Sequence, residues 1–305
     1  MIRKYRFGNP LNTEAVVESI PYGEGSVPFL KISEGDRITY GMEEDTRIYG
    51  LGEQVRGINK RGWIYVSDCT DDPNHREDTH SLYAAHNFLV FADKKTFGIF
   101  LDNPSRVTFD LGYTRQDTVV ITADCWDMDL YVIDGESVMD IVHQFRGMIG
   151  RSYIPPKWAF GYGQSRWGYR CEEDIREVER RYREAGIPLD SIYLDIDYME
   201  RFKDFTLNHE AFPEFPEFVK EMKEKHIHLV PIIDAGVKIE EGYPVYEEGV
   251  EKGYFCKDAE GNDFVAAVWP GRVHFPDMLN PEARRWFGHH YQFCWNRELT
   301  DSGTI

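Results

Sequence analysis

Two aspartates at the end of an apolar run are the residues of this sequence best placed to do chemistry. Residues 189–199 read LDSIYLDIDYM, so Asp195 and Asp197 directly follow a short stretch typical of a buried strand. Alternate residues of a strand lie on one face of the sheet, and we therefore expect the two carboxylates to share a face. Such a pair at the mouth of a parallel sheet indicates an active site. The alternative for either aspartate is a buried group that only hydrogen-bonds neighbouring backbone.

Polar residues also follow two further segments with the pattern of strands. Residues 159–164 lead into Gln-Ser-Arg-Trp at 164–167, and residues 228–233 (HLVPII) end at Asp234. Helical patterns separate the three strand segments, one over residues 175–185 with Gly186 as its stop and one over 216–226. Alternating strands and helices predict a parallel sheet that gathers functional residues at its carboxyl edge. We expect these groups to form three corners of a (β/α) barrel.

The remaining residues are too few to complete such a barrel. We expect a helix over 243–253, a hairpin over 254–268 and a helix that begins at Asn280-Pro281 and carries Cys294 on its apolar stripe. TDSGTI at 300–305 is typical of a turn entering a fourth strand. A (β/α)8 barrel has about 250 residues, whereas about 150 follow the Pro155-Pro156 pair. We predict an incomplete barrel at 151–305 with its first three to four strands.

The first half of the chain has the pattern of an antiparallel sandwich, expected at residues 1–150. Short apolar segments bounded by turn residues follow one another with no helical pattern between them. Residues 92–96 are predicted to be a hairpin loop, and a helix capped by Ser137 is expected to end near Gly150. The predicted strands are 29–32, 47–51, 63–66, 88–91, 98–101, 107–109, 119–122 and 130–133.

One long acidic loop interrupts the strands of the first half. Residues 67–80 read SDCTDDPNHREDTH, with four Asp, one Glu and two His. A loop of this length and polarity is either functional or merely solvated. His75 and His80 are five residues apart and lack the helical spacing of a zinc motif, so we expect no metal and no other cofactor.

The composition narrows the class of partner. Lys and Arg number 35 against 53 Asp and Glu, and the formal charge of −18 argues against nucleic acid or anionic membranes as partners. The five cysteines are scattered without CxxC spacing, which indicates reduced thiols. No signal peptide or apolar run of membrane-spanning length is evident, so we expect a cytoplasmic protein. The 7 Trp, 18 Tyr and 19 Phe point weakly to a carbohydrate ligand.

Several motifs together resemble glycoside hydrolase family 31, the α-glucosidase and α-xylosidase family. They occur in family order along most of the chain: IYGLGE, the acidic loop, IPPKWAFGYGQSRWGY, LDIDYM, KDFTLN, PIIDAGV, VWPG and FPDMLNP. The resemblance implies a galactose-mutarotase-like β-sandwich followed by a (β/α)8 barrel. It also implies hydrolysis with retention through two aspartates. The family's nucleophile motif, W-x-D-M-N-E, and its acid/base are not present, so we expect the catalytic residues beyond Ile305.

The resemblance carries over the sugar-binding half of a pocket for a non-reducing-end α-glucosyl residue. Asp71 is assigned to the acid contributed by the sandwich loop, with Asp68 and Asp72 as alternatives, and Asp197 and Asp277 are assigned structural roles. Trp167 is expected to shape the preference among sugars or linkages. The full set of expected substrate-binding residues is Asp71, Trp167, Asp195, Ile196, Ile232, Asp234 and Trp269.

We therefore expect the N-terminal portion of an α-glucosidase-like retaining hydrolase that binds small α-linked oligosaccharides and is inactive alone. One alternative is a naturally truncated carbohydrate-binding relative without catalysis. Another is a complete enzyme of a different barrel family that uses Asp195, Asp197 and Asp234 as catalytic groups or metal ligands. An incomplete barrel leaves an unpaired strand edge and bare apolar faces, so we also expect association, for example as a homo-oligomer.

Overall fold

The computed structural model describes residues 1–292, and the chain divides into two compact units. The first unit is Met1–Ser152 and the second begins at Tyr153. Cys294 and the turn predicted at residues 300–305 lie outside the described residues. Across residues 1–292, no helix combines the length and the apolar character needed to cross a lipid bilayer.

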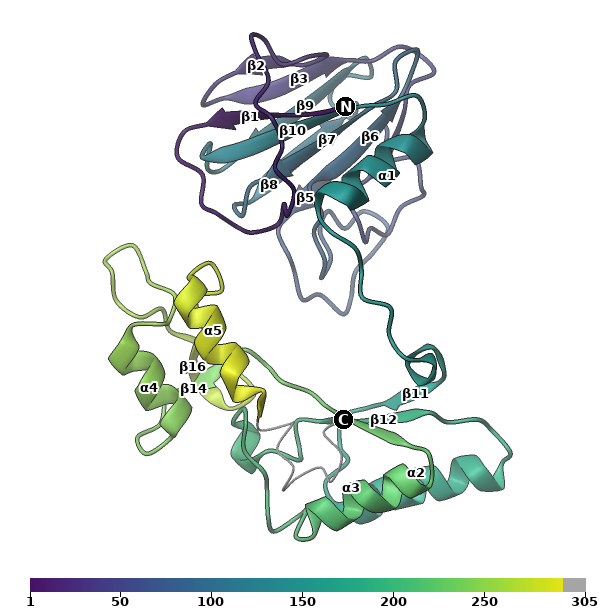
Figure 1. The fold of residues 1–305 in the computed structure, drawn as a ribbon, viewed down its shortest axis with the longest axis vertical. Coiled ribbons are helices and arrows are strands. Elements are labelled where there is room, and N and C mark those ends of the chain that lie inside the picture. Colours follow the sequence, from purple (N-terminus) through teal and green to yellow (C-terminus); the bar gives the residue numbers. More distant parts are fainter. Residues whose placement is uncertain (293–305) are drawn as a thin grey trace. The chain divides into compact units, whose positions relative to one another are not determined.

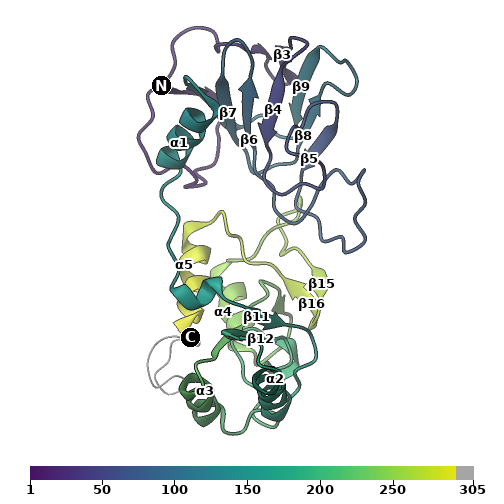
Figure 2. The ribbon, with the colours of Figure 1, turned by 90° about the vertical axis from the view of Figure 1, so that its right-hand side faces the viewer.

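The first unit is built from two five-stranded antiparallel sheets (Figures 1 and 2). One has the strand order β1-β10-β7-β6-β4 and the other β2-β3-β9-β8-β5. A continuous apolar core joins them, with Phe91 and Ile99 of the first sheet and Phe109 and Ile121 of the second fully buried. The strands are β1 Ile2–Phe7, β2 Lys31–Ser33, β3 Arg37–Gly41, β4 Arg47–Gly50, β5 Ile64–Ser67, β6 Phe88–Ala92, β7 Phe97–Asp102, β8 Val107–Leu111, β9 Thr118–Ala123 and β10 Met128–Asp134.

The predicted sandwich is confirmed, with two strands added. Each predicted segment overlaps an observed strand, and the hairpin at 92–96 is confirmed by the antiparallel pairing of Phe91 with Phe97. The unpredicted strands are β1 and β3, of which β1 (IRKYRF) carries too many charges to read as a buried strand. Helix α1 (Val138–Met148) begins as predicted, because the Ser137 side chain accepts the Asp140 N–H at 3.2 Å.

The second unit contains a parallel sheet of three strands, β11 (Gly163–Ser165), β12 (Ser191–Asp195) and β13 (His228–Pro231). Helices α2 (Glu172–Glu184) and α3 (Phe215–Glu224) connect them and lie on the same side of the sheet (Figures 1 and 2). Ile192 and Leu194 of the central strand are fully buried in a core shared with the apolar faces of both helices. The predicted alternation of strand and helix is confirmed.

A small antiparallel sheet follows, in the order β14-β16-β15. Its strands are β14 (Val237–Lys238), β15 (Ala266–Val268) and β16 (Gly271–His274), and it is accompanied by α4 (Pro244–Lys252) and α5 (Pro281–His290). Helix α5 starts where Asn280-Pro281 predicts, with the Asn280 side chain accepting the Glu282 N–H at 2.9 Å. Val237, Phe255 and Trp286 are buried in the core that packs this sheet against the two helices.

Two expected elements differ from the structure. Residues 157–160 form a 3-10 helix, η1 (Lys157–Phe160), and not the start of a strand; Pro156 precedes it in an extended conformation, with φ −62° and ψ 158°. The hairpin expected over 254–268 is confirmed only near its turn, where Lys257 pairs with Asp263 and the Asp258 N–H donates to the Asn262 oxygen at 2.9 Å. The second arm, β15, pairs with β16 instead, a strand that was not predicted.

We predict that the purified chain associates. In the described part of the chain, β11 and β13 each pair only with β12, so each presents one edge of unpaired backbone groups. Size-exclusion chromatography with light scattering over a range of concentrations should show dimers or larger species that increase with concentration. A monomer at every concentration, with sharp cooperative unfolding, would contradict this prediction.

We also predict that Ile192→Ala destabilises the second unit strongly. Ile192 is fully buried in the central strand, and truncating such a side chain costs about 2–5 kcal/mol. Urea unfolding followed by tryptophan fluorescence measures this change. Ile187→Ala is the matched control, because Ile187 is 51% exposed and its truncation should cost less than about 0.5 kcal/mol. Equal losses for the two variants would show that the core does not depend on β12.

Candidate functional site

A pocket of about 390 Å³ lies at the carboxyl ends of the three parallel strands. Trp167 follows β11, Asp195 ends β12 and Ile232 follows β13. Parallel pairing places these ends at the same edge of the sheet, and the turn between β15 and β16 adds Trp269. The lining residues are Trp167, Asp195, Ile196, Phe202, Ile232 and Trp269.

Five of the seven residues expected to bind substrate line this pocket. The two that do not are Asp234, which follows β13, and Asp71, which belongs to the first unit. Phe202 lines the pocket without having been predicted. The structure therefore brings the five residues together, and their contact with a sugar stays a prediction.

Asp195 ends its strand in a strained backbone conformation. Its φ is 57°, in the left-handed region that few residues other than glycine adopt. The β12–β13 pairing shifts register between Tyr193 and Asp195, and the Asp195 carboxylate accepts the N–H of Ile196 at 2.8 Å. The strand thus stops at Asp195, and the expectation that Asp197 shares its face through strand alternation was wrong. Strain of this kind is concentrated at functional sites.

Asp197 holds the turn that carries Trp167. Its carboxylate accepts the N–H of Gly168 at 3.2 Å, and burial raises its pKa. Gly168 has φ 102°, a conformation in which a residue with a Cβ would be strained. The contact ties the end of β11 to the segment after β12, as expected of a structural residue.

Aromatic side chains form the exposed walls of the pocket. Trp167 is 62% and Trp269 65% exposed, whereas Phe202 is half-buried. Large exposed rings offer flat apolar faces, which pack against the C–H faces of a sugar. Phe202 has φ 62° and follows Arg201 at φ 51° in the turn η2 (Glu200–Phe202). The charged sequence around Phe202 (ERFKD) gave no signal that this ring enters a pocket.

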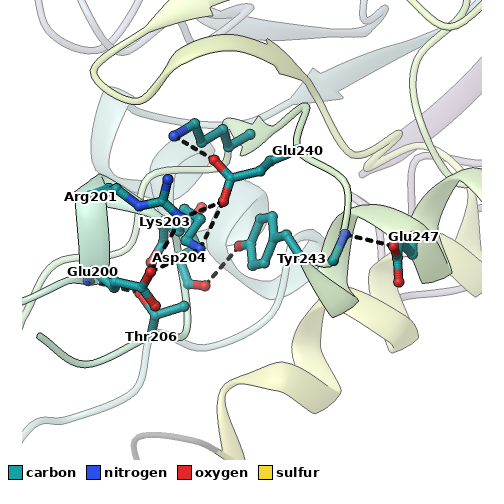
Figure 3. A network of polar contacts seen from close by, with 10 residues as sticks. Glu200, Arg201, Lys203, Asp204, Thr206, Glu240, Tyr243 and Glu247 are labelled. Atoms are coloured by element: carbon teal, nitrogen blue, oxygen red, sulfur yellow. Dashed lines mark hydrogen bonds and ion pairs between the residues drawn. The ribbon is translucent and has the colours of Figure 1, made fainter. Parts of the chain in front are cut away.

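A network of charges holds the turn that bears Phe202 (Figure 3). Glu240 is its centre and binds Arg201 at 2.6 Å, Lys203 at 3.1 Å and Lys238 at 2.8 Å. Hydrogen bonds from these lysines lower the pKa of Glu240 to about 2. Lys203, which is buried, also contacts Glu200 at 3.4 Å. The network links the turn after β12 to the segment after β14.

The end of β13 is fixed by two hydrogen bonds. Tyr198 donates its hydroxyl to the backbone oxygen of Ile232 at 2.9 Å, and Asp234 donates its N–H to the Asp204 carboxyl at 3.0 Å. Burial, together with the charge of Asp195, raises the pKa of Asp234. The Asp195 charge therefore disfavours the ionised form of Asp234.

The acidic loop of the first unit offers several acceptors, of which Asp68 and Asp71 are exposed. The Tyr83 hydroxyl donates to Asp71 at 2.6 Å, Asp68 lies 4.0 Å from Arg106, and Asp72 accepts the N–H of Asn74 at 2.9 Å. The choice among Asp68, Asp71 and Asp72 therefore stays open. Over residues 1–292, no group of three or more His, Cys, Asp or Glu residues is arranged to hold a metal ion.

Two family models match the chain. The glycosyl hydrolases family 31 TIM-barrel domain matches residues 152–300. The glycosyl hydrolase 31 N-terminal galactose mutarotase-like domain matches residues 4–110. Together they confirm the predicted fold class, a β-rich N-terminal domain followed by the first part of a family 31 barrel.

Curated relatives and solved structures agree with this match. Alpha-glucosidase 2 of Bacillus thermoamyloliquefaciens is 39% identical over 83% of this chain and 32% of its own length. Neutral alpha-glucosidase AB of Mus musculus is 32% identical over 90% of this chain and 31% of its own length. The GH31 dextranase of Flavobacterium johnsoniae complexed with glucose superposes with a TM-score of 0.77, at 25% identity, over 88% of this chain and 33% of its own.

These matches determine the family, although the chain spans only about a third of the length of these two curated relatives. The two family models cover both units, and the motifs that line the pocket lie within the barrel match. The chain belongs to glycoside hydrolase family 31.

Proposed function

We propose that this chain forms the sugar-binding part of an α-glucosidase-like retaining glycoside hydrolase. The pocket holds the non-reducing-end α-glucosyl residue of small α-linked oligosaccharides. One observation carries the proposal: the pocket unites an aspartate at a strand end with two exposed tryptophans, from three separate segments. Alpha-glucosidase 2 as a relative, and a dextranase complexed with glucose as a structural neighbour, support glucose as the sugar.

The pocket suits both surfaces of a sugar ring. Hydroxyl groups of the sugar donate to Asp195 and Asp234, and hydrogen bonds to ionised carboxylates are the stronger kind. The C–H faces of the ring pack against Trp269 and Trp167, which exclude water from those bonds. Phe202 and the aliphatic side chain of Ile232 complete the apolar wall. Binding of this kind fixes the orientation of the anomeric carbon for attack.

The bond-breaking groups are assigned elsewhere in the intact enzyme. Retention requires a nucleophilic carboxylate and an acid/base carboxyl about 5 to 5.5 Å apart on either side of the scissile bond. We assign Asp195 and Asp234 to sugar binding, because the family's W-x-D-M-N-E nucleophile motif does not occur in this sequence. By itself, therefore, the chain binds a sugar without cleaving it, since most of the rate enhancement requires the two catalytic groups.

We predict that the purified 305-residue chain releases no nitrophenol from 4-nitrophenyl α-D-glucopyranoside above the buffer rate. An intact family relative, assayed in parallel, provides the positive control. Turnover by the chain that a glucose-like inhibitor blocks would overturn the assignment of the catalytic groups to other residues.

We predict that Trp269→Ala weakens the binding of isomaltose. Loss of an exposed aromatic face costs about 1 to 1.4 kcal/mol, which raises the Kd about five- to tenfold. Titration calorimetry measures this change. The matched control is Tyr113→Ala, because Tyr113 is also an exposed ring (62%) but lies in the β8–β9 turn of the first unit. An unchanged Kd for Trp269→Ala would remove this wall from the proposed site.

A further inference from the structure

A buried carboxyl group on Asp204 follows the pocket residue Phe202 by two positions. Asp204 is 1% exposed, and one of its oxygens accepts the backbone N–H of Asp234 at 3.0 Å. The Tyr243 hydroxyl, itself in the core, donates to the backbone oxygen of Asp204 at 2.7 Å. These bonds anchor Asp204 between the start of α4 and the segment that follows β13.

The second oxygen of the Asp204 carboxyl lacks a hydrogen-bond partner among the described residues. Within residues 1–292, Oδ2 of Asp204 and Oδ2 of Asp234 are both buried and have no hydrogen-bond partner. A buried acceptor without a partner is costly, and a buried unpaired charge costs more. A proton on Asp204 removes the charge, which is the larger part of this cost.

The charged groups around Asp204 do not neutralise it. The adjacent Lys203 directs its ammonium to Glu200 and Glu240 (Figure 3). On α5, the His290 ring stacks on Phe205 and its Nε2 lies 3.5 Å from Glu248.

Protonation of Asp204 follows from these surroundings. Burial, opposed by the hydrogen bond from the Asp234 N–H and reinforced by the Asp234 charge, raises the pKa of Asp204 to about 8. Tyr243 is the other titratable group in contact, and burial raises its pKa as well, so its hydroxyl also stays neutral. The protonated form of Asp204 thus predominates at neutral pH.

We propose that Asp204 is a positioning residue of the sugar site: as a neutral acid, it holds the backbone of Asp234 so that the Asp234 carboxylate can accept a sugar hydroxyl. The proposal rests on the proposed function of the pocket. An ionised Asp204 would add a third negative group to Asp195 and Asp234, and repulsion in a poorly solvated space would displace Asp234.

Two substitutions separate positioning from a merely structural role. Asp204→Asn keeps a neutral group with an acceptor for the Asp234 N–H, so its Kd for glucose at pH 7 should stay within about twofold of wild type. Asp204→Ala removes the acceptor, and we expect at least about a tenfold higher Kd for the folded fraction. Asp102→Asn is the matched control, because burial also raises the pKa of Asp102 in the first unit. An Asp204→Ala chain that binds as wild type while unfolding more easily would overturn the proposal.

The pH dependence gives a second readout. Above the usual pKa of an aspartate, near 4, the folded chain holds a proton on Asp204 that the unfolded chain lacks. This contribution therefore lowers the folding equilibrium constant as pH rises to about 8, by up to about tenfold per pH unit. In Asp204→Asn this part of the pH dependence should disappear. Glucose binding by the wild type should also weaken at least about threefold between roughly pH 7 and 9, and binding by Asp204→Asn should not.

A measurement without ligand keeps the proposal separate from the proposed function. In chain labelled with ¹⁵N-aspartate, the Asp234 amide signal should shift with a midpoint near pH 8 in the wild type and show no such step in Asp204→Asn. Absence of the step in the wild type overturns the proposal. If no variant binds glucose, the proposed function fails, and a positioning role in sugar binding falls with it, while the amide titration still decides whether Asp204 sets the state of Asp234.

Discussion

The parallel pairing of β12 with both of its neighbours is the constraint on which the second unit depends. Gly163 pairs with Ser191 and Ser191 with His228, so the three strands start level and end at one edge. This register places Trp167, Asp195 and Ile232 at the pocket. A slip of one residue would turn the side chains of a strand to the opposite face of the sheet. Burial of Ile192 and Leu194 against α2 and α3 stabilises the observed register.

Several residues near this edge have backbone conformations that cost stability. Asp195, Phe202 and Phe205 all have positive φ values, and such residues persist only where surrounding contacts hold them. Those contacts are the ion pairs centred on Glu240 and the hydrogen bonds made by Asp204 and Tyr198. Rigid support of this kind lets a pocket orient a sugar without a large ordering cost on binding.

Much of the fold could be predicted from sequence because its signals are local. Apolar runs gave the strands, and caps such as Ser137 and Asn280-Pro281 gave helix starts that the structure confirms. No local sequence signal marks the left-handed turn at Asp195, the position of Phe202 in the pocket or the two-residue strand β14. Tertiary contacts create all three features. The family motifs named five of the six pocket residues, whereas the burial of Asp204 required the three-dimensional structure.

We propose that the pocket at the end of the parallel sheet holds the non-reducing-end glucosyl residue. The most direct test is a crystal structure of the chain grown with isomaltose at a saturating concentration. We expect one ordered glucose unit between Trp167 and Trp269, with hydroxyl groups within hydrogen-bond distance of Asp195 and Asp234. An empty pocket at saturation, or sugar ordered only at another place on the chain, would contradict it.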